Sequence, residues 1–131
     1  MITVHEAERL DHLLRSRGRG WEPVAGDRFV IPGRDLDQVF VVSEMTVDVE
    51  ELPTGRLVRF NGTTEWALDS IAADEVLWVP WEHQLRELLG EAFASLTRLP
   101  GAWVVALDDG TRHVGDDPES AYAAALLAGA P

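Results

Sequence analysis

Histidine and carboxylate side chains near the N-terminus have the residue types of a divalent-metal site. His5, Glu8 and His12 lie at positions i, i+3 and i+7, so a helix would place them on one side. Imidazole pairs that bind one ion lie four residues apart on a helix, whereas seven residues separate these two rings by about 10.5 Å along the axis. We therefore predict a solvated helix face here and no metal site.

Pairs of acidic residues recur along the chain, and calcium loops also use such residues. A calcium loop needs ligands at positions 1, 3 and 5, with Gly at 6 and Glu at 12. Counted from Asp108, positions 3 and 5 are Gly110 and Arg112, which cannot supply these ligands. We interpret the paired acids, Asp108-Asp109 and Asp116-Asp117 among them, as turn and helix-cap residues.

The residue inventory gives little support for covalent catalysis. There is no Cys, and the eleven basic residues are all Arg, so thiolate and lysine chemistry are excluded. Neither a G-x-S-x-G elbow nor a G-x-G-x-x-G loop is present. His113, close in sequence to Asp108 and Asp109, is the best single candidate for acid–base work, but an exposed strand histidine is the favoured interpretation. We predict no catalytic residue, no cofactor and no metal.

A turn that follows a predicted strand at 56–60 is the preferred binding site. Asn61-Gly62 is a turn dipeptide, and the threonines after it can cap a short helix that opens with Glu65 and Trp66. A helix N-terminus presents spare N–H donors, and a Trp near a loop offers the rigid area of an interface hot spot. The predicted binding residues are Arg59, Asn61, Thr63, Glu65 and Trp66.

Hydrophobic periodicity and turn signals predict the elements that position these residues. Helices are expected at about 3–17, 81–93 and 118–127, the first with a Thr3/Glu6 capping box and the last with Pro118 at its first position. Strands are expected at about 27–31, 38–51, 56–60, 76–79, 96–99, 102–107 and 111–114. Trp78 and Trp81 are expected in the core.

This pattern predicts an α+β fold in a single domain spanning residues 1–131. A largely antiparallel sheet of about five or six strands would pack with three main helices and one short helix. The last helix is apolar on nearly every side, which is typical of a helix on a sheet or in a partner interface.

The charge balance limits the partners. Twenty-three acidic residues against eleven basic ones give a net charge of −12, which repels phosphate backbones, so we predict no direct nucleic-acid binding. No apolar run approaches the ~20 residues that span a bilayer, and the N-terminus lacks the features of a secretory signal. We therefore predict a cytoplasmic protein without membrane contact.

One stretch, from about Trp21 to Gly90, resembles a set of small, acidic, Arg-rich actinobacterial proteins. The similarity rests on GDRFVIPGRDLDQVFVVSEMTVDVEEL, RLVRFNGTTEWALDSI and LWVPWEHQLRELLG. Those proteins often carry the label pilus assembly protein CpaE, a name that belongs to ATPases similar to MinD and ParA. Such ATPases need a Walker A loop with its Lys, and this chain has neither. The resemblance therefore implies no ATPase activity and transfers no functional residue.

Three functions follow as hypotheses. The first is a non-enzymatic protein-interaction module that binds a partner protein or itself through the Trp-containing turn at 59–66 and the neighbouring helix. The second is a small-molecule binder or hydrolase with a pocket of carboxylates and His113. The third is an acidic inhibitor that mimics nucleic acid. An exposed apolar patch would favour the first, and a deep pocket with convergent polar groups the second.

Overall fold

The computed structural model describes residues 1–32, 39–42, 47–52, 55–60, 70–72 and 76–129. These residues form an α+β structure with three α-helices and nine strands, arranged in three antiparallel sheets of three strands each. The α+β class and the antiparallel pairing are as predicted, but the described strands do not join one sheet of five or six. Two compact units contain them, residues 1–19 with 80–131 and residues 20–79. That residues 1–131 make one domain stays a prediction.

Helix α1 (Val4–Ser16) opens the first unit and confirms the predicted helix and its cap. The Thr3 hydroxyl accepts from the Glu6 N–H, and the Glu6 carboxylate accepts from the Thr3 N–H, at 3.0 and 2.9 Å. This capping box satisfies N–H groups that a helix start leaves without partners. The apolar stripe of α1 is buried through Ala7, Leu10 and Leu14.

Helix α2 (Glu82–Leu89) is shorter than the predicted helix at 81–93. Gly90 ends it with a φ of +58°, a conformation that glycine adopts without a steric penalty. One 3-10 turn, η2 (Gly90–Ala92), follows, and strand β7 (Phe93–Leu99) begins where the apolar spacing still suggested a helix. The side chains of Leu85, Leu89 and Ala92 are buried as a helical face would have them, so periodicity alone did not reveal the break.

Strands β7, β8 (Ala102–Leu107) and β9 (Arg112–Gly115) form the sheet of this unit in the order β7-β8-β9. The predicted hairpin at Asp108-Asp109-Gly110 joins β8 to β9 and is confirmed. Asp109 accepts hydrogen bonds from the Thr111 N–H and hydroxyl at 2.8 and 2.6 Å, which is the expected role of an Asp in a turn.

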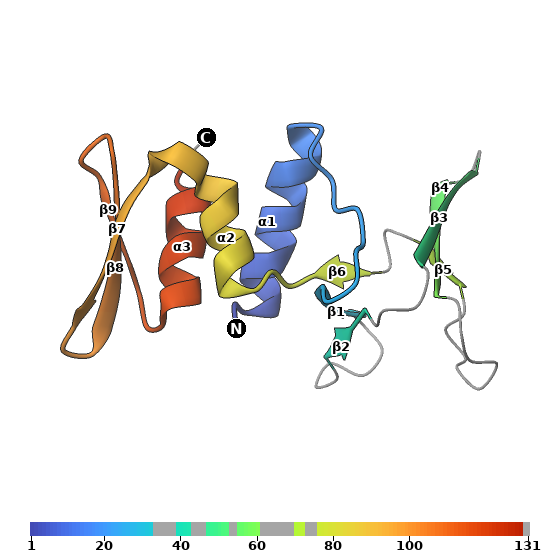
Figure 1. Ribbon diagram of the computed structural model, residues 1–131, viewed down its shortest axis with the longest axis horizontal. Coiled ribbons are helices and arrows are strands. Elements are labelled where there is room, and N and C mark those ends of the chain that lie inside the picture. Colours follow the sequence, from blue (N-terminus) through green and yellow to red (C-terminus); the bar gives the residue numbers. More distant parts are fainter. Residues whose placement is uncertain (33–38, 43–46, 53–54, 61–69, 73–75, 130–131) are drawn as a thin grey trace. The chain divides into compact units, whose positions relative to one another are not determined.

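Helix α3 (Pro118–Leu127) lies against β8 and β9 and also contacts α1 and α2 (Figure 1). Asp117 caps it by accepting from the Ser120 N–H at 2.7 Å, and Pro118 takes the first position, as predicted. Contacts on several sides explain why α3 is apolar nearly all round: Ala121, Tyr122, Ala123, Ala125 and Leu126 are all buried.

The second unit contains two sheets with short strands. Strands β2 (Phe40–Val41), β1 (Arg28–Val30) and β6 (Leu77–Trp78) form one sheet, whose cluster of buried residues includes Phe29, Ile31, Val42 and Val76. Strands β3 (Val47–Leu52), β4 (Gly55–Phe60) and β5 (Ser70–Ala72) form the other. The predicted strand at 38–51 is thus divided between two sheets, and its second part, β3, pairs antiparallel with β4.

The aromatic residues of this unit contact one another. Trp78 is half-buried, and its ring stacks on that of Trp21 with 6.3 Å between centroids. The Trp21 indole N–H donates to buried Asp27 at 2.8 Å, which satisfies part of the hydrogen-bonding capacity of the carboxylate.

Within the described ranges, no helix has the length and apolar character that a bilayer-spanning helix requires.

Candidate functional site

The predicted binding turn at 59–66 falls almost wholly outside the described residues. Asn61, Thr63, Glu65 and Trp66 belong to the segment 61–69, and so does the start of the predicted short helix. Arg59 lies on β4, opposite Asp48 on one side and Ser70 on the other. Whether these five residues gather at one surface therefore stays a prediction.

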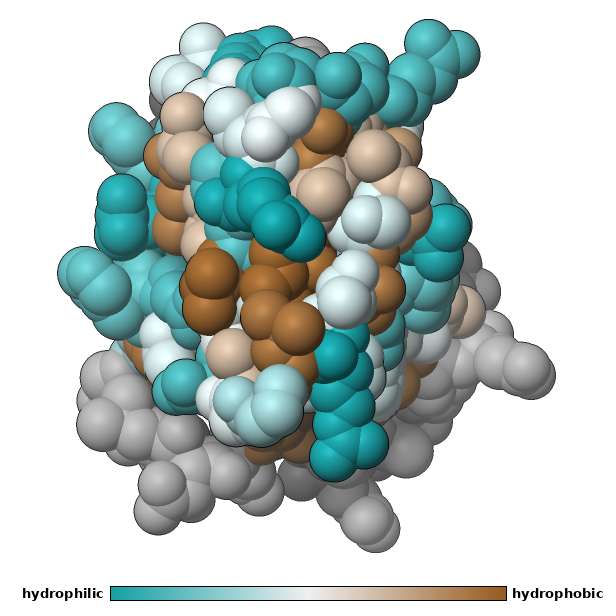
Figure 2. Space-filling model, turned by 90° about the vertical axis from the view of Figure 1, so that its left-hand side faces the viewer, coloured by the Kyte–Doolittle hydropathy of each residue, from teal (hydrophilic) through white to brown (hydrophobic). Residues whose placement is uncertain are grey.

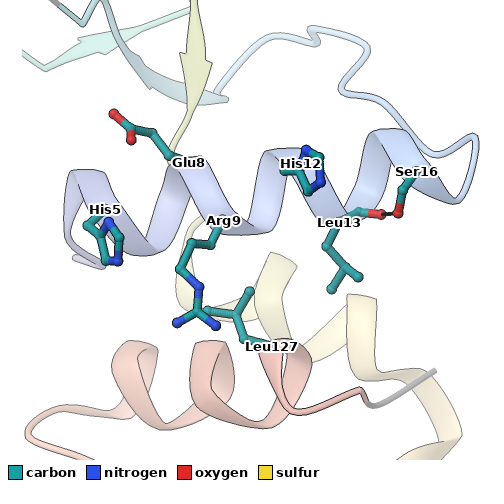
Figure 3. A pocket seen from close by; sticks show the side chains of 7 residues that line it. All are labelled: His5, Glu8, Arg9, His12, Leu13, Ser16 and Leu127. Atoms are coloured by element: carbon teal, nitrogen blue, oxygen red, sulfur yellow. Dashed lines mark hydrogen bonds between the residues drawn. The ribbon is translucent and has the colours of Figure 1, made fainter.

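An open hollow lies along α1, with a volume of about 540 Å³. It is bounded by two histidines, both charge signs, one hydroxyl and two leucines: His5, Glu8, Arg9, His12, Leu13, Ser16 and Leu127. In Figure 3, Arg9 points from α1 toward Leu127 on α3, whereas Glu8 points away from Arg9. Among the described side chains Arg9 forms no ion pair.

The hollow brings together the residues first considered for metal binding, but not as a ligand set. Figure 3 shows His5 and His12 spread along α1 rather than directed at one point. Within the part of the chain that the structure describes, no three His, Asp or Glu residues are grouped so that they could hold a metal ion. The groups that do face a common space are better suited to an organic anion, because Arg9 is a cation and the leucines offer apolar area.

His113 lies on β9 and is half-buried. Its Nε2 atom is 3.0 Å from the Thr111 hydroxyl, which in turn donates to Asp109. The hydrogen bond from the Thr111 side chain is the main cause that lowers the pKa of Asp109, and it favours the ionised carboxylate. Asp109, Thr111 and His113 thus form a chain of hydrogen bonds on an exposed hairpin, where it holds the turn in shape.

The third candidate is the face of the β7-β8-β9 sheet that α3 does not cover. Alternate residues of β8 point to opposite faces, and Val105 and Leu107 are buried on the helix side. Gly115 on β9 permits the close approach of α3, because a Cβ there would lie 2.3 Å from the Ala121 nitrogen. The opposite face therefore carries Ala102, Val104 and Ala106.

We call this surface the open face and define it by the register. Its rows are Leu99 with Ala102, then Thr97 with Val104 and Val114, then Ser95 with Ala106 and Arg112. Val114 is 61% exposed and Leu99 46% exposed, whereas Val104 in the central strand is only 5% exposed, so the exposed apolar area of this face comes mainly from the two edge strands. Figure 2 shows this side of the molecule, where hydrophobic residues gather near the centre with hydrophilic residues around them.

The charge of the open face differs from that of the chain as a whole. Strands β7, β8 and β9 contain two arginines and no acidic residue, although the chain carries a net charge of −12. Arg98 pairs with Trp103 and so belongs to the helix side of the sheet, where its guanidinium lies 5.8 Å from the ring centre of Trp103. Arg112 remains as the charged residue on the open face.

The open face was missed by the sequence-based prediction, although a signal for it existed. A strand was predicted at 102–107, and its alternation places Trp103, Val105 and Leu107 on one face. All six residues of the strand, AWVVAL, are apolar, and this pattern is typical of a strand covered on both sides. The described elements of this unit cover only one side, and Val114 adds to the apolar area of the other.

The chain matches no protein-family model, and no curated protein or solved structure is significantly similar to it.

Proposed function

We propose that this protein is a cytoplasmic, non-enzymatic protein-interaction module, and that the open face of the β7-β8-β9 sheet is one of its binding surfaces. The observation that carries the proposal is the exposed apolar area around Val114 in strands that have no carboxylate. Exposed apolar patches with a polar rim are typical of protein-binding sites. In a strongly acidic chain, an acidic partner also approaches strands that contain arginine and no carboxylate with less repulsion than it meets elsewhere.

The predicted turn at 59–66 remains a second proposed contact, with Trp66 as its anchor. The two proposed contacts lie in different units, so they can be tested separately. Trp66→Ala should reduce binding if the turn takes part, and it should leave the melting temperature nearly unchanged because the indole then faces the partner rather than the core.

The test compares two valines that are almost equally exposed. Val114→Asp places a carboxylate on the open face, whereas Val24→Asp places one on the other unit at a residue that is 58% exposed. Complexes formed by the native protein in its host are cross-linked and quantified for wild type and both variants. We expect Val114→Asp to lose them and Val24→Asp to keep them. Equal recovery with all three proteins would contradict the proposed surface.

A second candidate function is the binding of a small organic anion in the hollow along α1. Arg9 and the leucines Leu13 and Leu127 favour it, since they offer a cation beside apolar area. Titration with small aromatic carboxylates, followed by NMR shifts of the α1 amides, would reveal such binding, and Arg9→Ala should abolish it.

A further inference from the structure

Strand β9 is an edge of its sheet. It pairs with β8 on one side, and within the described ranges no strand pairs with its other side. The Leu107 N–H donates to the Thr111 carbonyl at 3.0 Å, and this bond identifies which residues of β9 hydrogen-bond to β8. Because inward and outward backbone groups alternate along an antiparallel strand, His113 and Gly115 direct theirs to β8, and Arg112 and Val114 direct theirs outward.

The side chains along this edge have a charge pattern that is complementary to its own reverse. Arg112 and Val114 belong to the open face. Asp116 follows the strand at a bend, and we extend the alternation of β9 by one residue to assign its side chain to the same face. All three are exposed. The sequence of properties is therefore positive, apolar, negative, with the apolar residue in the middle.

This pattern complements itself under a two-fold axis. If two β9 strands pair antiparallel about Val114, each Val114 lies opposite its counterpart and each Arg112 lies opposite an Asp116. Directly opposed side chains in such a pair are close enough to interact, and opposite charges there stabilise the pairing. His113 would lie opposite Gly115, which has no side chain to obstruct the imidazole.

We propose that the chain forms a two-fold homodimer in which the β9 edges of two copies join their sheets. This inference rests on the proposed function and names the partner as a second copy. Charge at a strand edge normally prevents such pairing, but here Arg112 and Asp116 neutralise each other between copies. The joined sheet would bring the two Val114 side chains together and extend the open face across both copies.

A charge swap tests the dimer. Arg112→Glu places like charges opposite each other at two positions of the proposed interface, and so does Asp116→Arg. The double variant Arg112→Glu/Asp116→Arg restores opposite charges. Arg19→Glu, just after α1, is the matched control, because it changes the net charge by the same amount as Arg112→Glu at an exposed arginine outside the hollow along α1.

The dimer dissociation constant is measured by sedimentation equilibrium, from low micromolar to millimolar protein. We expect each single reversal at the edge to raise it by about tenfold or more, which corresponds to roughly 1.4 kcal/mol. The double variant should return to within about threefold of wild type, a small difference in free energy. Circular dichroism of every variant establishes that it is folded, and Val114→Pro, which removes the central outward N–H, is expected to be monomeric.

Wild-type protein that stays monomeric throughout this range would overturn the proposal, and so would a dimer that ignores the single reversals or is not restored by the double one. These outcomes are distinct from a failure of the proposed function. If Val114→Asp abolishes complexes with another protein while the wild type is monomeric, the open face is a binding surface and the homodimer is wrong.

Discussion

Tyr122 shows how burial acts on a single residue. Its side chain is 1% exposed in α3, and the ring lies 5.8 Å from that of Phe93 on β7. Burial is the largest cause that raises the pKa of the phenol above 10.0, because the ionised form loses its hydration. The neutral hydroxyl is therefore the form that the folded unit favours.

The stability of the first unit should consequently fall as the pH rises above 10. The unfolded chain ionises Tyr122 at its ordinary pKa while the folded chain resists ionisation, so stability is fully present below pH 10 and is lost as the pH rises through the higher folded pKa. Tyr122 is the single tyrosine of the chain, so its absorbance can be titrated directly. Urea unfolding should depend less on pH in Tyr122→Phe, and equal dependence in both proteins would contradict the prediction.

Gly115 is the second residue with a specific role, because the α3 backbone occupies the space of its missing side chain. A methyl group there would meet the backbone of Ser120 and Ala121, which cannot rotate away as a flexible side chain can. Gly115→Ala should lower the free energy of unfolding by ~1–3 kcal/mol through overpacking. Urea unfolding measures this loss. Gly101→Ala is the comparison, because a Cβ at Gly101 would meet open space and only the positive φ there costs energy. A smaller loss of unfolding free energy in Gly115→Ala than in Gly101→Ala would refute the steric explanation.

At the scale of elements, caps and turns define where helices begin and end. Thr3 and Asp117 start α1 and α3, and Gly90 ends α2. Each of these signals acts within a few residues, because the groups it satisfies are the unpaired N–H and C=O groups of a helix terminus. Such signals do not depend on which unit the helix joins.

Replacing the cap of α3 should therefore weaken the whole first unit. Asp117→Ala leaves the Ser120 N–H without its acceptor, and the expected loss is about 1 kcal/mol. Asp117→Asn keeps an acceptor oxygen and should lose much less. Chemical denaturation of the three proteins at neutral pH provides the measurement, and equal losses for Ala and Asn would show that charge rather than capping is responsible.

At the scale of the whole molecule, the dominant property is a net charge of −12. The excess of acidic residues repels other anions from the protein. Strands β7 to β9 are an exception, because their only charged residues are the two arginines. This contrast between strands without an acidic residue and a strongly acidic chain is the electrostatic basis of the proposed binding surface.

The same charge leads to a prediction about nucleic acids. Fluorescence anisotropy with labelled duplex DNA and single-stranded RNA should show no binding even at low salt, where electrostatic attraction would be strongest. Binding that weakens steeply with added salt would contradict it and would imply a concentrated basic surface. Competition with a nucleic acid for a third protein would instead support the mimic hypothesis.

Much of the local structure could be predicted from the sequence. The Thr3/Glu6 box, the Asp117-Pro118 start and the Asp108–Gly110 hairpin are confirmed because each rests on contacts between near neighbours in the chain. The α+β class followed from the two periodicities of apolar residues. Composition alone excluded thiolate and lysine chemistry, since the chain contains neither Cys nor Lys.

Strand pairing and surface exposure were decided only by the tertiary structure. Residues 38–51 alternate as one strand would, yet β2 and β3 pair in different sheets, since pairing depends on partners far along the chain. Nothing in the sequence around Val114 marks this apolar residue as exposed. It is exposed because α3 approaches the other face of the sheet at Gly115. Contacts between near neighbours in the chain can be predicted from the local sequence. Which apolar face of a sheet is covered depends on where a helix that is distant in the sequence packs.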